Sequence, residues 1–247
     1  MRRFYASPQN FSQTKIMLAA EETRHLRDVL RLSENQQVQV FNGEGKEFLC
    51  RIETIGKRET QMEILEEVAP KSPESNLDLT LAVALLKGEK FDLVVQKAVE
   101  LGVFKIIPLI TKRADVKIRD AKDAEKKLKR WQRIALEAAK QSGRARLMKI
   151  EMPVDFEKFI KGSASRRPGV ENLILFAERG GEDFSKIKKT EQIVAVIGSE
   201  GGWEDAEIEA ARKSNFQIVT LSGRVLRAET AAIAIAAVLQ NRFGDFI

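Results

Sequence analysis

The residues best suited to chemistry lie in two glycine-containing turns near the C-terminus, at residues 197–202 and 221–231. The first reads Ile-Gly-Ser-Glu-Gly-Gly, and the second holds Arg224 and Arg227 beside Glu229. Glycines let a backbone approach a ligand closely. Each turn directly follows an apolar run, and ligands of open α/β sheets bind at the carboxyl ends of strands. Either turn alone is typical of an ordinary strand-to-helix connection, but the two together favour a ligand site.

Several common kinds of site are missing from the sequence. It has no GxGxxG motif after a strand, no GxxxxGK[ST] motif and no cluster of histidine and cysteine for zinc. A Ser-His-Asp triad would need the only histidine, His25, which lies far from both turns. An α/β enzyme that holds another nucleotide's phosphate at residues 197–202 is a rival, but the Glu200 carboxylate would repel that phosphate. We therefore expect no metal and no hydrolase chemistry.

Composition and charge narrow the class of protein. The single cysteine, Cys50, excludes an intrachain disulfide, and no apolar run is long enough to cross a membrane. The N-terminus has arginines but no apolar stretch behind them, so we expect no signal peptide and a cytoplasmic location. Residues 1–75 hold 11 basic and 12 acidic side chains, whereas residues 112–149 hold 14 basic and 5 acidic. This local excess indicates a polyanion partner such as nucleic acid, or else a solvated helix face.

Residues 1–70 are predicted to form a small β-rich unit. Short apolar or alternating stretches are separated by tight turns that contain glycine. The expected strands are residues 38–40, 48–55 and 60–65. A short helix is expected over residues 21–30. Prolines and small polar residues around 71–76 predict a linker.

Residues 77–247 are predicted to form an α/β domain. Apolar runs alternate with amphipathic helical stretches, and unbroken runs suit parallel strands that are buried on both faces. The runs are residues 79–86, 106–110, 173–177, 193–197 and 218–221. Pro108 cannot donate a hydrogen bond to a central ladder, so we place its strand near an edge or at a bulge.

Two helices of this domain differ in character. Residues 121–142 are predicted to be a long helix with an apolar face that includes Trp131 and with basic side chains elsewhere. Residues 230–239 read Thr-Ala-Ala-Ile-Ala-Ile-Ala-Ala-Val-Leu, which predicts a helix that is apolar all round. Such a helix must be buried on several sides, either within the domain or at a dimer interface.

Taken in order, the two turns resemble the signature of the ribosomal RNA small subunit methyltransferase E family, which belongs to the SPOUT class of knotted methyltransferases. The resemblance extends from near residue 2 to residue 245. Further matches are His25-Leu26, Val29-Leu30-Arg31, Lys97 with residues 100–103, Glu137 with Gln141 and Arg144, and Gly244-Asp245. Ser199 departs from the usual proline and Ser222 from the frequent glycine, which bears on the detailed loop geometry.

The resemblance implies an α/β protein with a PUA-like RNA-binding β-barrel at 1–70, a linker at 71–76 and a SPOUT domain with a trefoil knot at 77–247. It implies S-adenosyl-L-methionine as the methyl donor and a homodimer as the working form. The implied reaction is methylation of uridine N3 in 16S (small-subunit) ribosomal RNA, either free or in the assembled subunit. Knots are so rare that sequence patterns alone would exclude one.

The resemblance also implies that three strand-end loops line the cofactor pocket. The residues expected to bind the cofactor are Leu175, Phe176, Ala177, Ile197, Gly198, Glu200, Gly201, Gly202, Leu221, Ser222, Leu226, Thr230 and Ala231. The N3 of uridine must lose its proton before it attacks, and a guanidinium stabilises the resulting charge. We expect Arg224 or Arg227 in this role. Glu229 is expected to accept the proton or to pair with a neighbouring arginine, with bulk water as the alternative acceptor.

RNA binding is expected to use basic side chains in both parts of the chain. In the N-terminal unit they are Arg2, Arg3, Arg24, Arg27 and Arg31, and elsewhere they lie in the segment 112–149. We expect only packing roles for His25, Trp131 and Cys50. A non-catalytic RNA-binding protein, or a SPOUT methyltransferase acting on another RNA atom, would share the basic surface. Only the enzymes would bind the methyl donor.

Overall fold

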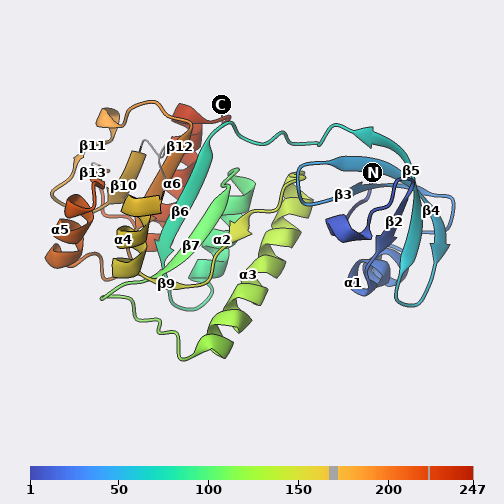
Figure 1. Ribbon diagram of the computed structural model, residues 1–247, viewed down its shortest axis with the longest axis horizontal. Coiled ribbons are helices and arrows are strands. Elements are labelled where there is room, and N and C mark those ends of the chain that lie inside the picture. Colours follow the sequence, from blue (N-terminus) through green and yellow to red (C-terminus); the bar gives the residue numbers. More distant parts are fainter. Residues whose placement is uncertain (167–171, 222, 247) are drawn as a thin grey trace. The chain divides into compact units, whose positions relative to one another are not determined.

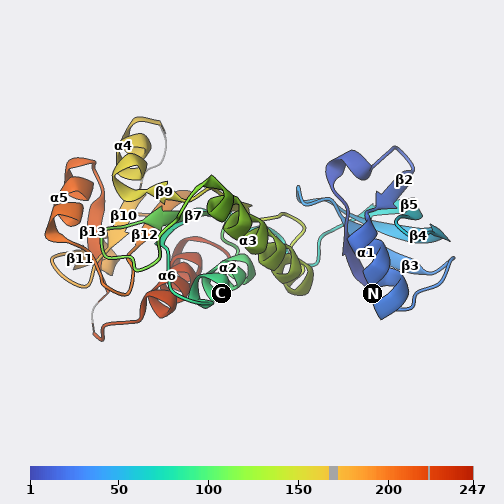
Figure 2. The ribbon, with the colours of Figure 1, turned by 90° about the horizontal axis from the view of Figure 1, so that it is seen from below.

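The computed structural model describes residues 1–166, 172–221 and 223–246, without the side chains of residues 163–166. It divides into two compact units, whose elements are labelled in Figure 1 and Figure 2. Unit 1 comprises Met1–Glu74 and Leu136–Leu147, and unit 2 comprises Ser75–Ala135 and Met148–Ile247. The boundary after Glu74 falls in the segment expected to be a linker. The second segment of unit 1 lies outside the contiguous domain that we expected from the sequence.

Unit 1 contains a five-stranded sheet in the order β1-β3-β4-β5-β2. The β1–β3 pair is parallel and the other pairs are antiparallel. The strands are β1 (Arg3–Tyr5), β2 (Lys15–Leu18), β3 (Gln37–Phe41), β4 (Glu47–Ile55) and β5 (Thr60–Val68). The three predicted strands are confirmed. The other two, β1 and β2, have only three and four residues, too few for a clear alternation.

A helical segment of unit 1 covers the core that its strands build. It consists of α1 (Ala20–Arg24), which continues directly as a π-helical turn, η2 (His25–Val29). This confirms the predicted short helix. A separate 3₁₀ turn, η1 (Pro8–Asn10), precedes β2. Leu26 lies in the core cluster, and His25 packs edge-on against Phe4 with 6.2 Å between ring centroids. Cys50 is also in this core, where burial raises the pKa of its thiol to about 12.

Buried ion pairs fasten the second segment of unit 1 to the first. The Arg3 guanidinium pairs with Glu47 at 2.7 Å and donates hydrogen bonds to the carbonyl oxygens of Ala139 and Arg144. The Arg3 side chain is 8% exposed and that of Glu47 is 0% exposed. Two further pairs join Lys140 to Glu22 and Arg144 to Glu74. Partners far apart in the sequence therefore hold residues 136–147 in this unit.

Unit 2 contains an eight-stranded parallel sheet in the order β11-β13-β10-β12-β6-β7-β8, with β9 also paired to β7. The five predicted apolar runs form its long strands. They are β6 (Asp78–Ala84), β7 (Lys105–Ile110), β10 (Asn172–Phe176), β12 (Gln192–Ile197) and β13 (Gln217–Thr220). The short strands are β8 (Lys149–Ile150), β9 (Val154–Asp155) and β11 (Glu182–Asp183). The prediction of a parallel α/β sheet is confirmed.

Pro108 lies on the outermost long strand, which agrees with the edge position expected for it. It is in register with Val83 of β6 on the inner side. On the outer side, β8 pairs with Lys105 and Ile106, whereas β9 pairs with Leu109 and Ile110. The outer ladder is therefore interrupted at the position where proline has no N–H to donate.

Helices cover both faces of the sheet in unit 2 (Figure 2). On one face α2 and α6 pack against each other and α6 contacts β6 and β12, while on the other α4 contacts α5, β7 and β9. The helices are α2 (Lys90–Glu100), α3 (Ala121–Ser142), α4 (Phe156–Arg166), α5 (Asp205–Lys213) and α6 (Ala228–Phe243), with a 3₁₀ turn, η3 (Phe184–Lys186). Trp131 of α3 is buried against Phe91 of α2, with ring centroids 4.6 Å apart, so its expected packing role is confirmed. In the described ranges, no helix is both long and apolar enough to cross a bilayer.

Candidate active site

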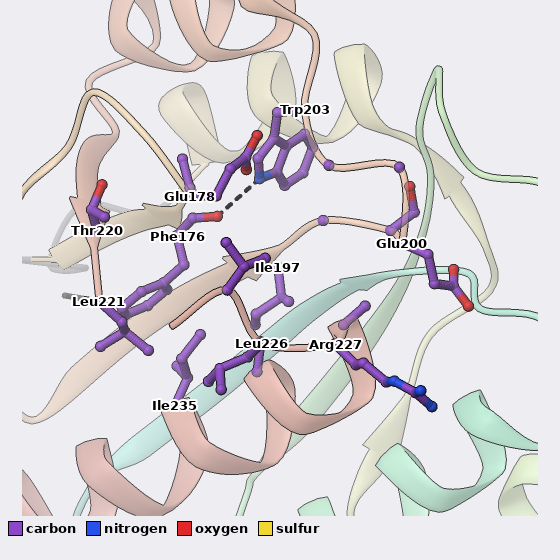
Figure 3. Close-up of a pocket in the computed structure, with 18 of the residues that line it drawn as sticks. Phe176, Glu178, Ile197, Glu200, Trp203, Thr220, Leu221, Leu226, Arg227 and Ile235 are labelled. Atoms are coloured by element: carbon purple, nitrogen blue, oxygen red, sulfur yellow. Dashed lines mark hydrogen bonds between the residues drawn. The ribbon is translucent and has the colours of Figure 1, made fainter. Parts of the chain in front are cut away.

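Three strands of unit 2 end side by side at one edge of the sheet. They are β13, β10 and β12, which are neighbours in that order and run parallel. Their carboxyl ends therefore meet, which is where ligands bind in open α/β sheets. The loops that follow β10, β12 and β13 face one another there, and the start of α6 lies below them in the view of Figure 3.

These loops enclose a cavity of about 530 Å³. Its lining is largely apolar, and Phe176, Ile197 and Leu226 point toward one another in Figure 3. The full lining is Phe176, Ala177, Glu178, Ile197, Gly198, Ser199, Glu200, Gly201, Gly202, Trp203, Thr220, Leu221, Gly223, Arg224, Val225, Leu226, Arg227, Ala228, Ala231 and Ile235. All of these residues belong to unit 2.

Trp203 and Arg179 tie the loop after β12 to the loop after β10. The indole of Trp203 is buried and donates a hydrogen bond to the carbonyl oxygen of Phe176 at 2.9 Å (Figure 3). Arg179 donates to the carbonyl oxygen of Trp203 at 3.0 Å and to Asp205 at 2.7 Å, and it also pairs with Glu178. The hydrogen bond with Asp205 raises the pKa of Arg179, as does the charge of Glu178. Side chains outside both glycine turns therefore join two of the loops that line the cavity.

Two glycines of the loop after β12 are required by this packing. A Cβ atom on Gly198 would lie 3.0 Å from the Trp203 ring. Gly202 has φ +67°, and a Cβ atom there would lie 3.0 Å from the Glu178 carboxylate. The glycines thus let the loop fold tightly onto Trp203 and Glu178, in addition to the expected approach of a ligand.

Arg224 and Arg227 are exposed residues of the cavity lining, on the segment between β13 and α6. Neither guanidinium forms an ion pair with a residue that the structure describes. Between them Val225 is 86% exposed. In Figure 3 Arg227 points away from Phe176 and lies on the same side of the view as Glu200. Two uncompensated positive charges at an apolar cavity suit an anionic or anion-forming substrate.

Glu200 and Glu229 share a cation that the sequence analysis did not identify. Lys90, the first residue of α2, lies 2.9 Å from Glu200 and 3.8 Å from Glu229. Burial raises the pKa of Glu200, but hydrogen bonds from Lys90 and backbone amides, together with the charge of Lys90, outweigh it and hold the pKa below its usual value. The expected ion pair of Glu229 is therefore made with Lys90, not with a neighbouring arginine. The signal for Lys90 was its place four residues after the end of the apolar run 79–86, near the carboxyl end of an expected strand.

The structure brings most of the residues expected at the cofactor pocket into the cavity lining. Those present are Phe176, Ala177, Ile197, Gly198, Glu200, Gly201, Gly202, Leu221, Leu226 and Ala231. Leu175 is instead wholly buried in the core, because alternate residues of β10 face opposite sides of the sheet. Thr230 is exposed on α6 outside the lining, and Ser222 lies outside the described residues. Sequence reasoning missed Trp203 as a pocket residue, since it lies just outside the glycine turn 197–202.

The arginines expected to bind RNA in unit 1 fall into three groups. Arg3 is buried in its pair with Glu47, so its guanidinium serves the fold and is not available to RNA. Arg27 pairs with Asp28 and donates to the backbone at Gly56. The exposed members are Arg2, Arg24 and Arg31. In the basic segment, Lys140 and Arg144 likewise serve buried ion pairs.

Among residues 1–166, 172–221 and 223–246, no group of three or more histidine, cysteine, aspartate or glutamate side chains is placed to hold a metal ion.

Residues 73–240 match the RNA methyltransferase domain family, and residues 18–65 match the RNA methyltransferase PUA domain family. The chain is 33% identical over 243 residues to ribosomal RNA small subunit methyltransferase E of Rickettsia conorii, covering 95% of this chain and 93% of the relative. It is 39% identical to the enzyme of the same name from Mesomycoplasma hyopneumoniae, over 69% of this chain and 72% of that one. The chain belongs to the ribosomal RNA small subunit methyltransferase E family. This confirms the resemblance found in its sequence.

A solved relative shows the same fold with a ligand. The chain aligns to ribosomal RNA small subunit methyltransferase E from Neisseria gonorrhoeae, bound to S-adenosyl methionine, with a TM-score of 0.88, 34% identity and full coverage of both chains. A methyltransferase from Legionella pneumophila with bound S-adenosyl methionine aligns with the same TM-score, 33% identity and 98% coverage of each chain. The family is thus one of S-adenosyl methionine-dependent methyltransferases with a PUA domain and a parallel α/β domain.

Proposed function

We propose that this chain transfers a methyl group from S-adenosyl-L-methionine to N3 of a uridine in 16S ribosomal RNA. The observation that carries the proposal is the cavity of unit 2, formed by the carboxyl ends of β10, β12 and β13 and flanked by Arg224 and Arg227. Family membership supports methylation of ribosomal RNA, and the two exposed arginines at the cavity support a nucleobase as the methyl acceptor. The proposed substrate would place the protein in the cytoplasm.

The cavity suits a nucleoside-like methyl donor. Its volume of about 530 Å³ lies within the roughly 300–1,000 Å³ that is usual for small-molecule sites. Apolar side chains such as Leu221, Leu226 and Ile197 would contact the faces of an adenine, and Glu200 would offer a polar contact. S-adenosyl-L-methionine bound there would supply an electrophilic methyl group on a sulfonium.

The arginines at the cavity have a direct use in this reaction. Uridine N3 becomes a nucleophile when it loses its proton, and the negative charge then spreads to the neighbouring ring oxygens. A guanidinium beside the base favours that anion and lowers the barrier to attack. We assign this role to Arg227, with Arg224 as the alternative, because both side chains are exposed at the cavity and free of ion pairs with described residues.

Glu229 is poorly placed to take the proton from N3. Its side chain is 13% exposed, and its Oε2 atom is buried without a hydrogen-bond partner in the described residues. A uridine bound in the cavity could reach this atom only if the residues that cover the Glu229 carboxylate moved aside. We therefore propose that the proton leaves to water and that Glu229 acts through its ion pair with Lys90.

We propose that exposed basic side chains of both units bind RNA. In unit 1 these are Arg2, Arg24 and Arg31, with a contribution from Arg27. In unit 2 they lie on the outer side of α3, where Lys122, Lys126, Lys129 and Arg133 are exposed. Their contacts would be to phosphates, so affinity should fall steeply with salt.

Three further features are proposed from the family alone. We infer that the sheet of unit 1 closes into a PUA-like barrel, that the chain around the cavity forms a trefoil knot, and that two copies form a homodimer. The exposed Val238 on α6 and Leu93 on α2, two helices that pack together, support an apolar contact with a second copy.

The first test is calorimetric titration of the purified chain with S-adenosyl-L-methionine, with ATP as the control. We expect saturable binding of the methyl donor and none of ATP. Methyl transfer to 16S ribosomal RNA, free and in assembled small subunits, would then be followed by mass spectrometry of the digested nucleosides. The appearance of N3-methyluridine is the expected result, and a 2′-O-methyl product would instead assign another RNA atom.

A non-catalytic RNA-binding protein is the principal rival. It would bind RNA but not the methyl donor, with or without RNA present. That outcome would overturn the proposal, whereas ATP binding alone would point to an enzyme that uses another nucleotide.

A further inference from the structure

Lys90 connects two segments that border the cavity. It begins α2, which follows β6, and β6 is the sheet neighbour of β12. Its ammonium lies 2.9 Å from Oε1 of Glu200, in the loop after β12, and 3.8 Å from Oε2 of Glu229, in the first turn of α6. Lys90 itself is outside the cavity lining. Any effect on a ligand must therefore pass through the residues it holds.

Glu200 is the member of this trio that lines the cavity. Among described residues, the Lys90 ammonium supplies the one side-chain hydrogen bond to its carboxylate, beside backbone hydrogen bonds from Lys87 and from Glu200 itself. A glutamate side chain without such a partner samples several rotamers, and fixing it in one costs conformational entropy. The charged hydrogen bond from Lys90 selects one position before a ligand arrives.

Glu229 makes the position of Lys90 more definite. Its carboxylate is mostly buried, and its Oε2 atom has no hydrogen bond within the described chain, so the nearby ammonium is its charge compensation. A buried carboxylate left without a cation is unfavourable, which holds Lys90 in place between the two acids. Glu229 thus anchors Lys90, and Lys90 orients Glu200.

We propose that Lys90 is a positioning residue for the methyl donor, because it holds the Glu200 carboxylate in the wall of the cavity while anchored by Glu229. This inference rests on the proposed function, since it takes the ligand of the cavity to be S-adenosyl-L-methionine. It adds a segment after a fourth strand, β6, to the three strand-end loops that form the site.

The experiment is a double-mutant cycle on donor affinity, measured by calorimetric titration with S-adenosyl-L-methionine. We expect Lys90→Met to weaken binding about tenfold, the size of a lost charged hydrogen bond. In a Glu200→Gln background the same change should have no further effect, because Lys90 acts through Glu200. If the two losses multiply, Lys90 acts by another route and the inference is overturned.

Two controls separate positioning from a loss of folding. Lys15→Met removes a comparable lysine–glutamate pair, 3.0 Å from Glu53 in unit 1, and should leave donor affinity within about twofold. Lys90→Arg keeps the charge and should retain affinity within about threefold. Thermal melting of every variant reports folding, and a loss in Lys90→Arg equal to that in Lys90→Met, with both folded, would contradict the inference.

The same titrations distinguish this inference from the proposed function. If the unaltered chain does not bind the donor, the proposed function fails. If the unaltered chain binds it and folded Lys90→Met binds equally well, only the positioning role of Lys90 fails.

Discussion

Arg3 of unit 1 and the two arginines at the cavity of unit 2 are used in opposite ways. In unit 1, Arg3 is buried against Glu47 and donates to backbone carbonyl oxygens of residues 139 and 144. In unit 2, Arg224 and Arg227 are exposed at the cavity and form no ion pair with a described residue. The first kind of arginine stabilises a fold and has little capacity left for a ligand. The second kind keeps its charge available, which is what a developing anion requires.

The largest expected effect tests the structural half of this comparison. Replacing Arg3 with methionine leaves Glu47 buried without a cation, which should lower the free energy of unfolding by about 3–5 kcal/mol. Urea denaturation measures the loss. The neighbouring, exposed Arg2→Met is the matched control and should change stability by no more than about 0.5 kcal/mol. Equal stability of the two variants would show that burial does not separate the two kinds of arginine.

The catalytic half of the comparison is tested by Arg227→Ala. Loss of the charge beside the base should reduce the rate of methyl transfer by about 10²–10³-fold, while donor affinity and melting temperature stay close to those of the unaltered chain. Single-turnover assays on 16S ribosomal RNA give the rate. Arg224→Ala in the same assay shows which of the two acts on the base, and near-normal turnover in Arg227→Ala would remove that residue from the mechanism.

Arg179 is intermediate between the two kinds, since it is partly exposed yet joins two loops of the site. Arg179→Met should free the loop after β10 from that after β12 and weaken donor binding roughly fivefold. Arg51→Met, which removes an exposed pair with Glu63 in unit 1, is the control and should leave binding unchanged. A similar affinity in both variants would mean that Trp203 alone sets the spacing of the loops.

The smallest effect concerns the exposed arginines of unit 1. Arg24→Gln and Arg31→Gln should each weaken RNA binding a few-fold and reduce the slope of log affinity against log salt by about 1. Filter binding at several salt concentrations measures both quantities. Unchanged slopes would assign these side chains to solubility and leave RNA capture to other cations.

The sequence predicted the elements well where a periodic pattern was long. The runs that became β6, β10 and β12 are continuous and apolar, and α3 has a clear apolar face, so their positions were predictable. The glycine turns also located the cavity, because strand ends of a parallel sheet meet at one edge.

Contacts between side chains that are far apart in the sequence could not be predicted from the sequence alone. Arg3 and Arg24 look alike in the chain, and only the fold shows that Glu47 and residues 136–147 enclose the first of them. Lys90 lies 110 residues before Glu200, so their hydrogen bond follows from the neighbouring positions of β6 and β12. Trp203 was missed because a residue just before a helix N-terminus gives no sign that its side chain reaches the end of β10.

Unit 1 is built from two separate segments of the chain, and this has a consequence for its folding during synthesis. Met1–Glu74 leaves the ribosome first, but Leu136–Leu147, which supplies Lys140 for Glu22 and Arg144 for Glu74, is made later. At about 5–20 residues per second, the roughly seventy intervening residues take on the order of 4–15 s to synthesise. During that interval the nascent N-terminal segment carries acidic side chains whose partners do not yet exist. We expect its final, protease-resistant state only after translation has passed residue 147.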